Sequence, residues 1–408
     1  MERKKYLSKI FLFFFLFFYT LNINALTLES DKYILYNMND EKILLEEKAN
    51  EKAHIASLTK IMTTIVAIEN IDDFDKKVTI TYDMVKDIEW DVAIVGFNVG
   101  ETVTYNDLLH GSLLSSGADA VNALALSIGK SYPNFVKMMN DKVKELGLTK
   151  THFANVVGLY DEENYSTAYE VAEILKYALK NEKFKQVFET KNYTSTTGRK
   201  MKSTVQSYNE KINEDISYIK GGKTGYINAA GYCLATTSTI DNVNYMLVTL
   251  NAYDGTSPHI KDAIKTYKYY SKNYSYQPIV ENNTIITTLN TIYAKEKTID
   301  IKANYYKESY LKNNYDKSKL KYEYQGIDEI SYFMEQNTKL GTVKVYFEDE
   351  LLDEFDLLYK ETLEFSLLSF LWINKVPVII ISIVLLLISR IIYVQIKRRI
   401  RRRKRARK

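Results

Sequence analysis

The sequence has very little of the two residue types that cross-link proteins and hold metal ions. Its 408 residues contain one cysteine, Cys233, and four histidines. A single cysteine cannot form an intramolecular disulfide, and one thiol with four imidazoles is too little material for a framework of several zinc ions. We therefore expect no metal site in this protein.

The composition excludes a chain that is wholly disordered or fibrous. Hydrophobic residues make up 46% and charged residues 26% of the sequence, which is the range of folded proteins. The length leaves room for two or three domains of ordinary size.

Positive charge is scarce in the middle of the chain. The net charge is +4, but residues 1–25 carry four basic groups and one acidic group, and residues 376–408 carry eleven basic groups. Residues 26–375 therefore hold 40 basic and 50 acidic groups. A nucleic-acid reader normally carries its positive charge on the folded domain, where fixed side chains meet the phosphates. We therefore expect no nucleic-acid partner.

The N-terminus is typical of a secretory signal peptide. Four basic residues within residues 1–9 precede an unbroken apolar run over residues 10–19, and the polar stretch that follows ends in the small residue Ala25. This layout predicts a signal peptide at residues 1–25. An uncleaved N-terminal anchor is the alternative, because the end of the segment is not a clean Ala-x-Ala site.

The C-terminus predicts a membrane anchor. Residues 376–396 are almost wholly apolar, with one charge, Arg390, whose long stem can reach a membrane interface. Residues 397–408 contain ten Lys or Arg, and the positive-inside bias keeps such a segment in the cytoplasm. We expect a single transmembrane helix at 376–396, a basic cytoplasmic tail at 397–408 and an extracytoplasmic body. The alternative, a helix lying in the interface, needs a polar face that residues 376–389 lack.

Hydrophobic spacing divides the body into two parts. A β-hairpin is predicted at residues 32–47, around Asn39-Asp40, and an amphipathic helix at residues 57–70. Further helices are expected at 105–114, 118–129, 133–146, 167–181 and 261–270, and adjacent strands at 231–237 and 244–250. This mixture predicts an α/β domain with a largely antiparallel sheet at residues 26–278. Short runs rich in Val, Ile, Thr and Tyr predict a small all-β domain at residues 279–365.

One Ser-x-x-Lys motif stands out by its context. In this motif a serine nucleophile and a lysine base lie one helical turn apart on one face. Ser57 and Lys60 match it and stand at a predicted helix N-terminus after a hairpin. The motif alone is weak, because it also begins at four other positions in this Lys-rich chain: Ser127, Ser217, Ser309 and Ser318.

Two further elements follow Ser57 in the chain. Ser116-Gly117 lies between two predicted helices, and we expect Ser116 to lie on the short loop that connects them. Residues 223–225 are the only Lys-Thr-Gly in the sequence and lead toward the strand at Gly231. Alone, each of these two elements is explained by an ordinary turn, and the Ser57 motif by a solvated serine and lysine. These three explanations are independent of one another. The joint occurrence of the three elements in this order indicates a serine-based acyl-transfer site.

With these residues the sequence resembles a known family, the low-molecular-mass penicillin-binding proteins that are serine-type D-alanyl-D-alanine carboxypeptidases. The resemblance covers roughly residues 26–275. It extends beyond the motifs to residues 56–63, 158–159, 165–168, 223–226 and 230–234. It implies a penicillin-binding transpeptidase-like (serine β-lactamase-like) α/β fold with an antiparallel sheet and a helical subdomain, followed by the small all-β domain and the transmembrane helix.

The resemblance also implies catalytic roles. Ser57 would attack the carbonyl of the penultimate D-alanine of a peptidoglycan stem peptide, and Lys60 would accept its proton. To do so Lys60 must be neutral, so burial and the nearby cation Lys223 would have to lower its pKa. Ser116 would pass a proton toward the leaving D-alanine.

Substrate-binding roles are implied for the Lys-Thr-Gly segment. Lys223 and Thr224 would hold the terminal carboxylate, and Gly225 would let the strand edge approach the peptide closely. The backbone N–H groups of Ser57 and Tyr226 would form the oxyanion hole. Every role is filled by side chains or backbone, so no cofactor is expected.

Two departures from the family pattern predict weaker substrate contacts. The second motif of the family commonly ends in Asn, where this chain has Ala118, and Asp119 or Asn122 would have to compensate. Where such enzymes often carry an Arg before the last helix, this chain has His259, and a neutral His would bind a carboxylate less firmly than Arg.

The predicted function is a penicillin-sensitive D-Ala-D-Ala carboxypeptidase that acts in cell-wall maturation at the membrane. Its expected partners are the stem peptide of peptidoglycan, β-lactam antibiotics and the cell membrane. A non-catalytic receptor for wall peptides or β-lactams is the alternative, although twelve basic-rich residues are poor material for an output domain. A serine β-lactamase shares the motifs but is usually free or lipidated and lacks a β-rich domain with a basic-tailed anchor.

Overall fold

The computed structural model describes residues 26–405. The chain divides into two compact units, the first ending at Asn273 and the second beginning at Tyr274. The predicted signal peptide, residues 1–25, lies outside the described residues. The expected domain boundary at Pro278 falls within the first strand of the second unit, β10 (Tyr274–Val280).

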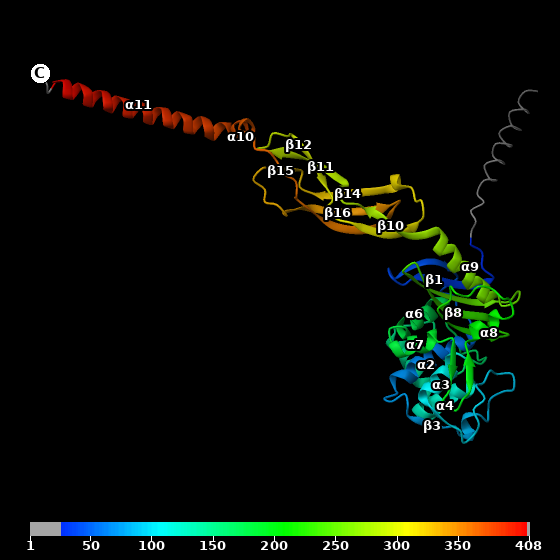
Figure 1. Ribbon diagram of the computed structural model, residues 1–408. Helices are drawn as coiled ribbons and strands as arrows, with labels where there is room; N and C mark the ends of the chain where they lie inside the picture. The colour runs from blue at the N-terminus through cyan, green and yellow to red at the C-terminus, as the bar shows by residue number, and fades with distance from the viewer. Residues whose placement is uncertain (1–25, 406–408) are drawn as a thin grey trace, which may run out of the picture. The chain divides into compact units, whose positions relative to one another are not determined.

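The first unit contains a five-stranded antiparallel sheet in the order β2-β1-β9-β8-β7 (Figure 1). Its strands are β1 (Ser30–Asn37), β2 (Lys42–Glu47), β7 (Gly221–Ile227), β8 (Gly231–Ile240) and β9 (Val243–Ala252). The predicted hairpin is β1–β2, and the predicted adjacent strands are β8 and β9. β7 carries the Lys-Thr-Gly segment, pairs with β8 and forms one edge of the sheet.

Helices cover both faces of this sheet, because alternate residues of a strand point to opposite sides. α9 (Pro258–Asn273) packs on one face, where Tyr267 is hydrogen-bonded to Thr236 of β8. α6 (Ala168–Ala178) and most of the remaining helices pack on the other, while α8 (Thr204–Asn209) contacts α9 and β7 (Figure 1). The remaining helices are α2 (Thr59–Glu69), α3 (Tyr105–Leu113), α4 (Ala118–Gly129), α5 (Tyr132–Glu145), α7 (Glu182–Glu189) and α8 (Thr204–Asn209).

Short elements complete the first unit. Two small antiparallel strand pairs are formed by β3 (Lys77–Thr79) with β4 (Thr102–Thr104), and by β5 (Asn192–Thr194) with β6 (Lys200–Lys202). Single 3-10 turns are η1 (Ala56–Leu58) and η2 (Tyr82–Met84). The sequence patterns did not predict α7, α8 or these strand pairs, since each is too short for a periodic signal.

The prediction that the Ser57 helix is amphipathic is wrong. α2 is buried from Thr59 through Ile68, and it contacts α3, α4, α5, α6 and α7. Its polar residues face partners inside the protein: Thr63 donates a hydrogen bond to the Val156 carbonyl at 2.8 Å, and the hydroxyl of Thr64 lies 2.8 Å from that of Ser112. α2 is therefore the central helix of the unit, which makes it a rigid support.

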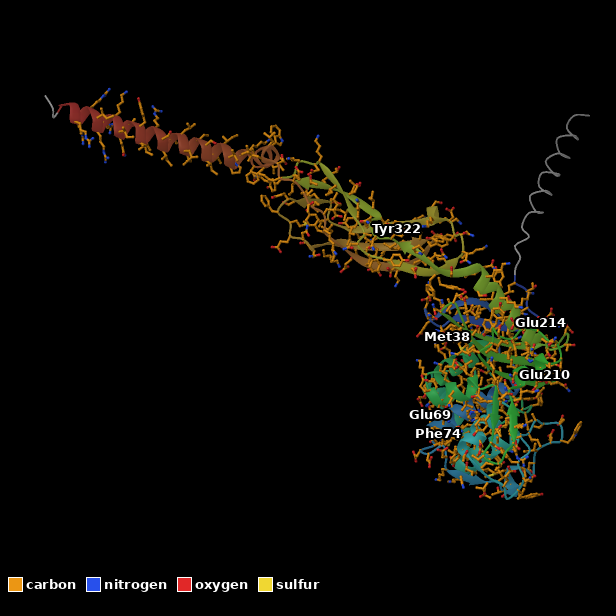
Figure 2. All side chains as sticks on the ribbon, viewed as in Figure 1. Met38, Glu69, Phe74, Glu210, Glu214 and Tyr322 are labelled. Atoms are coloured by element: carbon orange, nitrogen blue, oxygen red, sulfur yellow. The ribbon has the colours of Figure 1, made fainter. Side chains whose placement is uncertain are left out.

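The second unit is built from eight strands and a 3-10 turn. β10 pairs with β13 (Lys307–Lys312), while β11 (Ile285–Ile292) lies between β12 (Thr298–Lys302) and β15 (Glu329–Ser331). β16 (Lys339–Phe347) lies between β14 (Leu320–Gly326) and β17 (Glu350–Leu358), and η3 spans Lys317–Lys319. Tyr322, labelled in Figure 2, donates a hydrogen bond to the Ile279 carbonyl at 2.7 Å and so ties β14 to β10.

Two helices follow the strands of the second unit: α10 (Leu367–Ile373) and the long α11 (Lys375–Arg405). Among the described residues, residues 375–403 form the one helical stretch that is long and apolar enough to cross a membrane. It includes the predicted span at 376–396 and is compatible with a membrane anchor.

Candidate active site

Ser57 and Lys60 are in direct contact, although they stand on different elements. Ser57 lies in the η1 turn and Lys60 in the first turn of α2, so the chain places them three residues apart across a helix start. The Lys60 ammonium nitrogen donates hydrogen bonds to Ser57 Oγ at 2.8 Å and to the Val157 carbonyl at 2.7 Å. Ser57 is half-buried, whereas Lys60 is only 1% exposed.

Burial lowers the pKa of Lys60 to about 7. The cause is desolvation, because a charged ammonium loses its water shell inside the protein while a neutral amine loses little. No carboxylate is hydrogen-bonded or paired to Lys60 among the described residues, so nothing there restores the charge. A substantial neutral fraction at physiological pH leaves this amine able to accept a proton from Ser57.

Two glycines allow the η1 turn to sit where it does. A Cβ added to Gly225 of β7 would lie 2.9 Å from the backbone nitrogen of Ser57, and one added to Gly158 would lie 2.0 Å from the Ala56 carbonyl oxygen. Ala56 itself has a positive φ of 46°. The backbone around the nucleophile is therefore strained and closely packed against β7, which is common at functional sites. Gly225 provides room for the nucleophile turn, a role that the sequence pattern did not indicate.

Ser116 is brought to this site from the loop between α3 and α4. The expected short loop is present, and Ser116 has a positive φ of 55°. The Lys223 ammonium nitrogen donates hydrogen bonds to Ser116 Oγ at 2.9 Å and to the Thr224 carbonyl at 2.6 Å. Lys223 is fully buried, and its pKa is held well below the usual value by desolvation and then by the nearby charge of Lys60.

These residues meet at a cleft of about 1020 Å³. Lys223 is not among the residues that line it, so it acts on the cleft through Ser116 and Thr224. The lining includes most of the predicted site residues and one that sequence reasoning missed, Thr204 at the start of α8, whose hydroxyl accepts a hydrogen bond from Thr224 at 2.7 Å. Lining residues from this set are Ser57, Lys60, Ser116, Thr204, Thr224, Gly225 and Tyr226.

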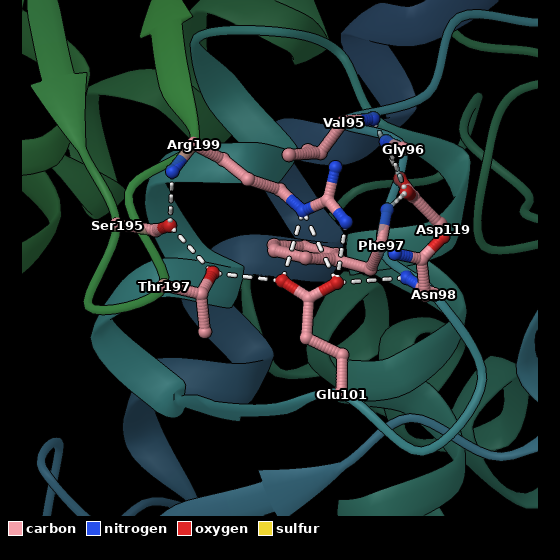
Figure 3. Close-up of polar contacts among 9 residues, drawn as sticks. All are labelled: Val95, Gly96, Phe97, Asn98, Glu101, Asp119, Ser195, Thr197 and Arg199. Carbon is pink, nitrogen blue, oxygen red and sulfur yellow. Dashed lines mark hydrogen bonds and ion pairs between the residues drawn. The ribbon is translucent and has the colours of Figure 1, made fainter.

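Asp119 does not replace the missing Asn of the second motif. Its carboxylate is buried and accepts hydrogen bonds from the backbone N–H groups of Val95, Gly96 and Phe97 at 2.9, 2.8 and 3.0 Å (Figure 3). The N–H of Ala118 donates to the Ala93 carbonyl at 2.8 Å. The suggested compensation by Asp119 is therefore wrong, because its acceptor oxygens already hold the segment before β4 against the Ser116 loop.

Asn122, the other suggested replacement, donates a hydrogen bond to the Met84 carbonyl at 3.1 Å. It is not among the residues that line the cleft of Ser57. Its amide is thus placed in a structural contact with η2.

A second anchor holds the far end of the same segment. Glu101 forms a bidentate ion pair with Arg199. It also accepts hydrogen bonds from the Thr197 hydroxyl and from the Asn98 backbone N–H (Figure 3). Chiefly through the bond to Arg199, the pKa of Glu101 is lowered to about 2. Together with Asp119, this pair fixes the segment that directly follows the cleft-lining residues Asp91, Val92 and Ala93.

His259 does not bind at the cleft in the way an Arg would. Its side chain is fully buried, stacks on Tyr232 with ring centres 5.0 Å apart, and meets the edge of Tyr208 at 4.7 Å. Desolvation lowers the pKa of His259 to about 3, and neither ring nitrogen has a hydrogen-bond partner. His259 is therefore a neutral ring within an aromatic cluster, and the expected contact with a substrate carboxylate is wrong.

Comparisons with known proteins agree with this geometry. A family model described as D-alanyl-D-alanine carboxypeptidase matches residues 20–254, and one described as the C-terminal domain of penicillin-binding protein 5 matches residues 274–364. The D-alanyl-D-alanine carboxypeptidase DacF of Bacillus subtilis is 29% identical over 345 residues, which cover 82% of this chain and 86% of that protein. DacC of Escherichia coli is 32% identical over 240 residues, 56% of this chain and 58% of that protein.

Solved structures share the fold. Penicillin binding protein 5 from Haemophilus influenzae has a TM-score of 0.61 at 22% identity and covers 83% of this chain and 98% of its own. The Streptomyces K15 DD-transpeptidase has a TM-score of 0.54 at 29% identity and covers 60% of this chain and 98% of its own. The predicted transpeptidase-like fold with a C-terminal all-β domain is confirmed.

Proposed function

The chain belongs to the D-alanyl-D-alanine carboxypeptidase family of serine peptidases, and from this premise we propose that it removes the terminal D-alanine from peptidoglycan stem pentapeptides through an acyl-enzyme on Ser57. β-Lactams would mimic the substrate and acylate the same serine. The reaction needs a nucleophile, a base, a proton donor for the leaving group and a carboxylate site, and each has a candidate in the cleft.

The observation that carries this proposal is the contact between Lys60 and Ser57. A serine hydroxyl is a weak nucleophile unless a neighbouring base removes its proton as the bond forms. The Lys60 nitrogen lies 2.8 Å from Ser57 Oγ, and its pKa of about 7 supplies the neutral amine for that task. A solvated serine and lysine on a surface helix would lack the lowered pKa, because the ammonium would keep its water shell.

Acylation follows from this contact. Ser57 Oγ bonds to the carbonyl carbon of the penultimate D-alanine while its proton moves to the Lys60 amine. The developing oxyanion is stabilised by the backbone N–H groups of Ser57 and Tyr226. Collapse of the tetrahedral intermediate breaks the peptide bond, and the proton that Lys60 accepted passes through the Ser116 hydroxyl to the leaving amino group of D-alanine. Lys223 supports this step, because its hydrogen bond orients the Ser116 hydroxyl.

The terminal carboxylate of the substrate is recognised beside β7. Thr204 and Thr224 bring two hydroxyl groups together at the cleft, and Lys223 lies behind them with its own hydrogen bond to the Thr224 carbonyl. Recognition thus relies on hydroxyl donors and one buried lysine rather than on an exposed guanidinium, since His259 is enclosed. Water then hydrolyses the acyl-enzyme and releases the shortened stem.

We place the protein at the cell membrane, with the catalytic unit outside it. This placement rests on the signal-like residues 1–25, on the apolar α11 helix and on the positive charge that follows it. It would put the cleft in the compartment where stem peptides and β-lactams are found.

The test is D-alanine release from a pentapeptide ending in D-Ala-D-Ala, using the full chain in detergent. We expect release by the wild type, loss of more than about 1,000-fold in Ser57→Ala, and little change in the matched control Ser127→Ala, which removes the serine of another Ser-x-x-Lys sequence. Release should rise as the pH increases through about 7, as Lys60 loses its proton. Equal release by Ser57→Ala, or stable acylation by penicillin without peptide turnover, would contradict the proposal.

A further inference from the structure

One tyrosine hydroxyl in the cleft of Ser57 is left without a hydrogen-bond partner within residues 26–405. It belongs to Tyr208 of α8, which lines the cleft and is half-buried. The hydroxyl of a buried tyrosine normally finds a partner, and a phenol can both donate and accept a hydrogen bond. The free hydroxyl of Tyr208 therefore points to a polar group that a ligand in the cleft supplies.

Tyr208 lies beside the two threonine hydroxyls of the carboxylate site. Thr204 and Tyr208 are four residues apart on α8, so their side chains share one face of the helix. Thr224 and Tyr226 are two residues apart on β7 and point to the same side of the sheet. All four line the cleft, and the Thr224 hydroxyl donates a hydrogen bond to that of Thr204. Tyr208 thus adds a third hydroxyl to this pair, one helical turn further along α8.

An aromatic cluster holds the ring of Tyr208. The ring forms edge-to-face contacts with His259 and Tyr232, with ring centres 4.7 and 5.8 Å apart. The Lys211 ammonium nitrogen lies 4.9 Å from the centre of the same ring. Edge-to-face and cation–π contacts fix a ring without using its hydroxyl. The cluster therefore orients Tyr208 before a ligand binds and leaves its hydroxyl available.

The basic groups of the cleft do not provide an exposed cation for a carboxylate. Within the described part of the chain Lys60 is the one basic residue that lines the cleft, and its amine is hydrogen-bonded to Ser57. A carboxylate has two oxygens that together accept several hydrogen bonds, so neutral donors can hold it. Burial raises the pKa of Tyr208, with smaller contributions from two neighbouring tyrosines, so that its hydroxyl keeps its proton and acts as a donor.

We propose that Tyr208 donates a hydrogen bond to the C-terminal carboxylate of the peptide substrate and, with Thr204 and Thr224, forms a carboxylate site of three neutral hydroxyl groups. This inference rests on the proposed function, since it assigns a specificity-determining residue to the same cleft. A hydrogen bond to an ionised acceptor is roughly twice as strong as one between neutral groups. The Tyr208 hydroxyl therefore favours a peptide with a free C-terminus over one whose chain end is uncharged.

The test compares the binding of Nα-acetyl-Ala-D-Ala-D-Ala with that of its C-terminal amide. The full chain in detergent carries Ser57→Ala, so no acyl-enzyme forms, and calorimetry gives the two dissociation constants. Adding Tyr208→Phe removes one oxygen and keeps the ring in its cluster. We expect this change to weaken binding of the acid about 10- to 100-fold, as for a hydrogen bond to a charged group, and binding of the amide by less than about 5-fold.

Tyr160→Phe is the matched control. Tyr160 also lines the cleft, and the substitution removes the same single oxygen. It should change neither dissociation constant by more than about 2-fold. Thermal unfolding checks that both variants are folded.

Kinetics with the active chain distinguish a binding role from a structural one. Because the carboxylate is held equally in the ground state and the transition state, Tyr208→Phe should raise KM for the acid about 10- to 100-fold and change kcat by less than about 3-fold. A fall in kcat with an unchanged KM would show that Tyr208 only supports the fold of the cleft, and would overturn the inference.

The binding experiment also separates this inference from the proposed function, since it needs no turnover. A preference for the acid that is lost in Tyr208→Phe supports the carboxylate site even if the wild type releases no D-alanine. Equal weakening of the acid and the amide, or unchanged binding of both, overturns it even if the wild type is an active carboxypeptidase.

Discussion

The two units of the chain fill their interiors differently. The first buries many polar and charged side chains, among them Lys60, Ser116, Asp119 and Lys223. In the described part of the second unit, the buried side chains are all aliphatic or aromatic, such as those of Ile301, Val343 and Leu357.

This difference indicates which of the two units carries the catalytic groups. Burying a lysine without an acidic partner costs folding free energy, so such a group persists only where the change in its pKa serves a purpose. An apolar core stabilises a fold and does no chemistry. The second unit thus has the interior of a structural module, and the first has the interior of an enzyme.

The largest expected effect comes from removing the buried base. Lys60→Met should lower D-alanine release by about 10³- to 10⁴-fold, because Ser57 loses its proton acceptor. The folded-state pKa of Lys60, about 7, lies below the unfolded value of about 10.5, so the unfolded chain binds more protons between these values and the stability of the wild type rises with pH across that window.

Chemical denaturation at pH 7 and pH 9 measures this rise. In the wild type the free energy of unfolding should increase by about 2 kcal/mol over these two pH units because of Lys60, and the Lys60→Met variant should lack this increase. Lys302→Met, which removes an exposed lysine in the second unit, should keep it. The same gain in both variants would show that Lys60 is not the source.

The next prediction compares a glycine with no space for a Cβ atom with a glycine that has the space, where both have a positive φ. Gly158→Ala places a Cβ 2.0 Å from the Ala56 carbonyl oxygen, whereas Gly147→Ala meets nothing within 4 Å, although both glycines have positive φ. We expect Gly158→Ala to lose activity by more than about 100-fold and stability by about 3 kcal/mol or more, and Gly147→Ala to lose about 1 kcal/mol of stability only. Thermal unfolding and D-alanine release measure both.

A glycine in the second unit tests whether damage to that unit leaves catalysis by the first unit unchanged. A Cβ on Gly341 of β16 would lie 2.4 Å from the Gln325 carbonyl oxygen of β14. Gly341→Ala should therefore destabilise the second unit by about 2–3 kcal/mol while D-alanine release at a temperature where both units are folded stays near the wild-type rate. A large loss of catalysis would contradict the division into a structural and a catalytic unit.

A smaller effect is expected at the anchor of the Ser116 loop. Asp119→Asn keeps the shape but replaces one acceptor oxygen by an NH₂ group that faces a backbone N–H, so the hold on Val95, Gly96 and Phe97 is weakened. We expect a 10- to 100-fold lower kcat with stability reduced by about 1–3 kcal/mol. Glu145→Gln, on an exposed part of α5, is the control. Unchanged kcat would show that the loop needs no such anchor.

The smallest effect is expected at His259. Because both ring nitrogens lack partners and the ring stacks on Tyr232 and contacts Tyr208 edge-on, His259→Phe should change activity less than about 3-fold and stability by less than about 1 kcal/mol. His259→Arg should instead destabilise the protein, because its charge would be buried without a partner. Stronger peptide binding by His259→Arg would contradict this placement.

Much of the first unit could be predicted from local patterns. The β1–β2 hairpin, most of the long helices and the β8–β9 pair follow from periodicity within a few residues. The Ser57–Lys60 pair was also predictable, since three residues across a helix start bring the two side chains together whatever surrounds them. The roles of Thr204, Asp119 and His259 were not, because each depends on contacts with residues that are distant in the chain.

The sequence by itself determined which nucleophile, base and donor groups are present, in what order, and which short segments become helices or strands, because these depend on residue type and near neighbours. Only the tertiary structure decided how those groups behave. It lowers the pKa of Lys60 by enclosing α2, and it joins Lys223 to Ser116 across 107 residues of chain. It also buries His259 against Tyr208, so that Tyr208 lines the cleft and His259 does not. Desolvation and packing are properties of the whole surroundings of a side chain, and those surroundings exist only once distant segments have folded together.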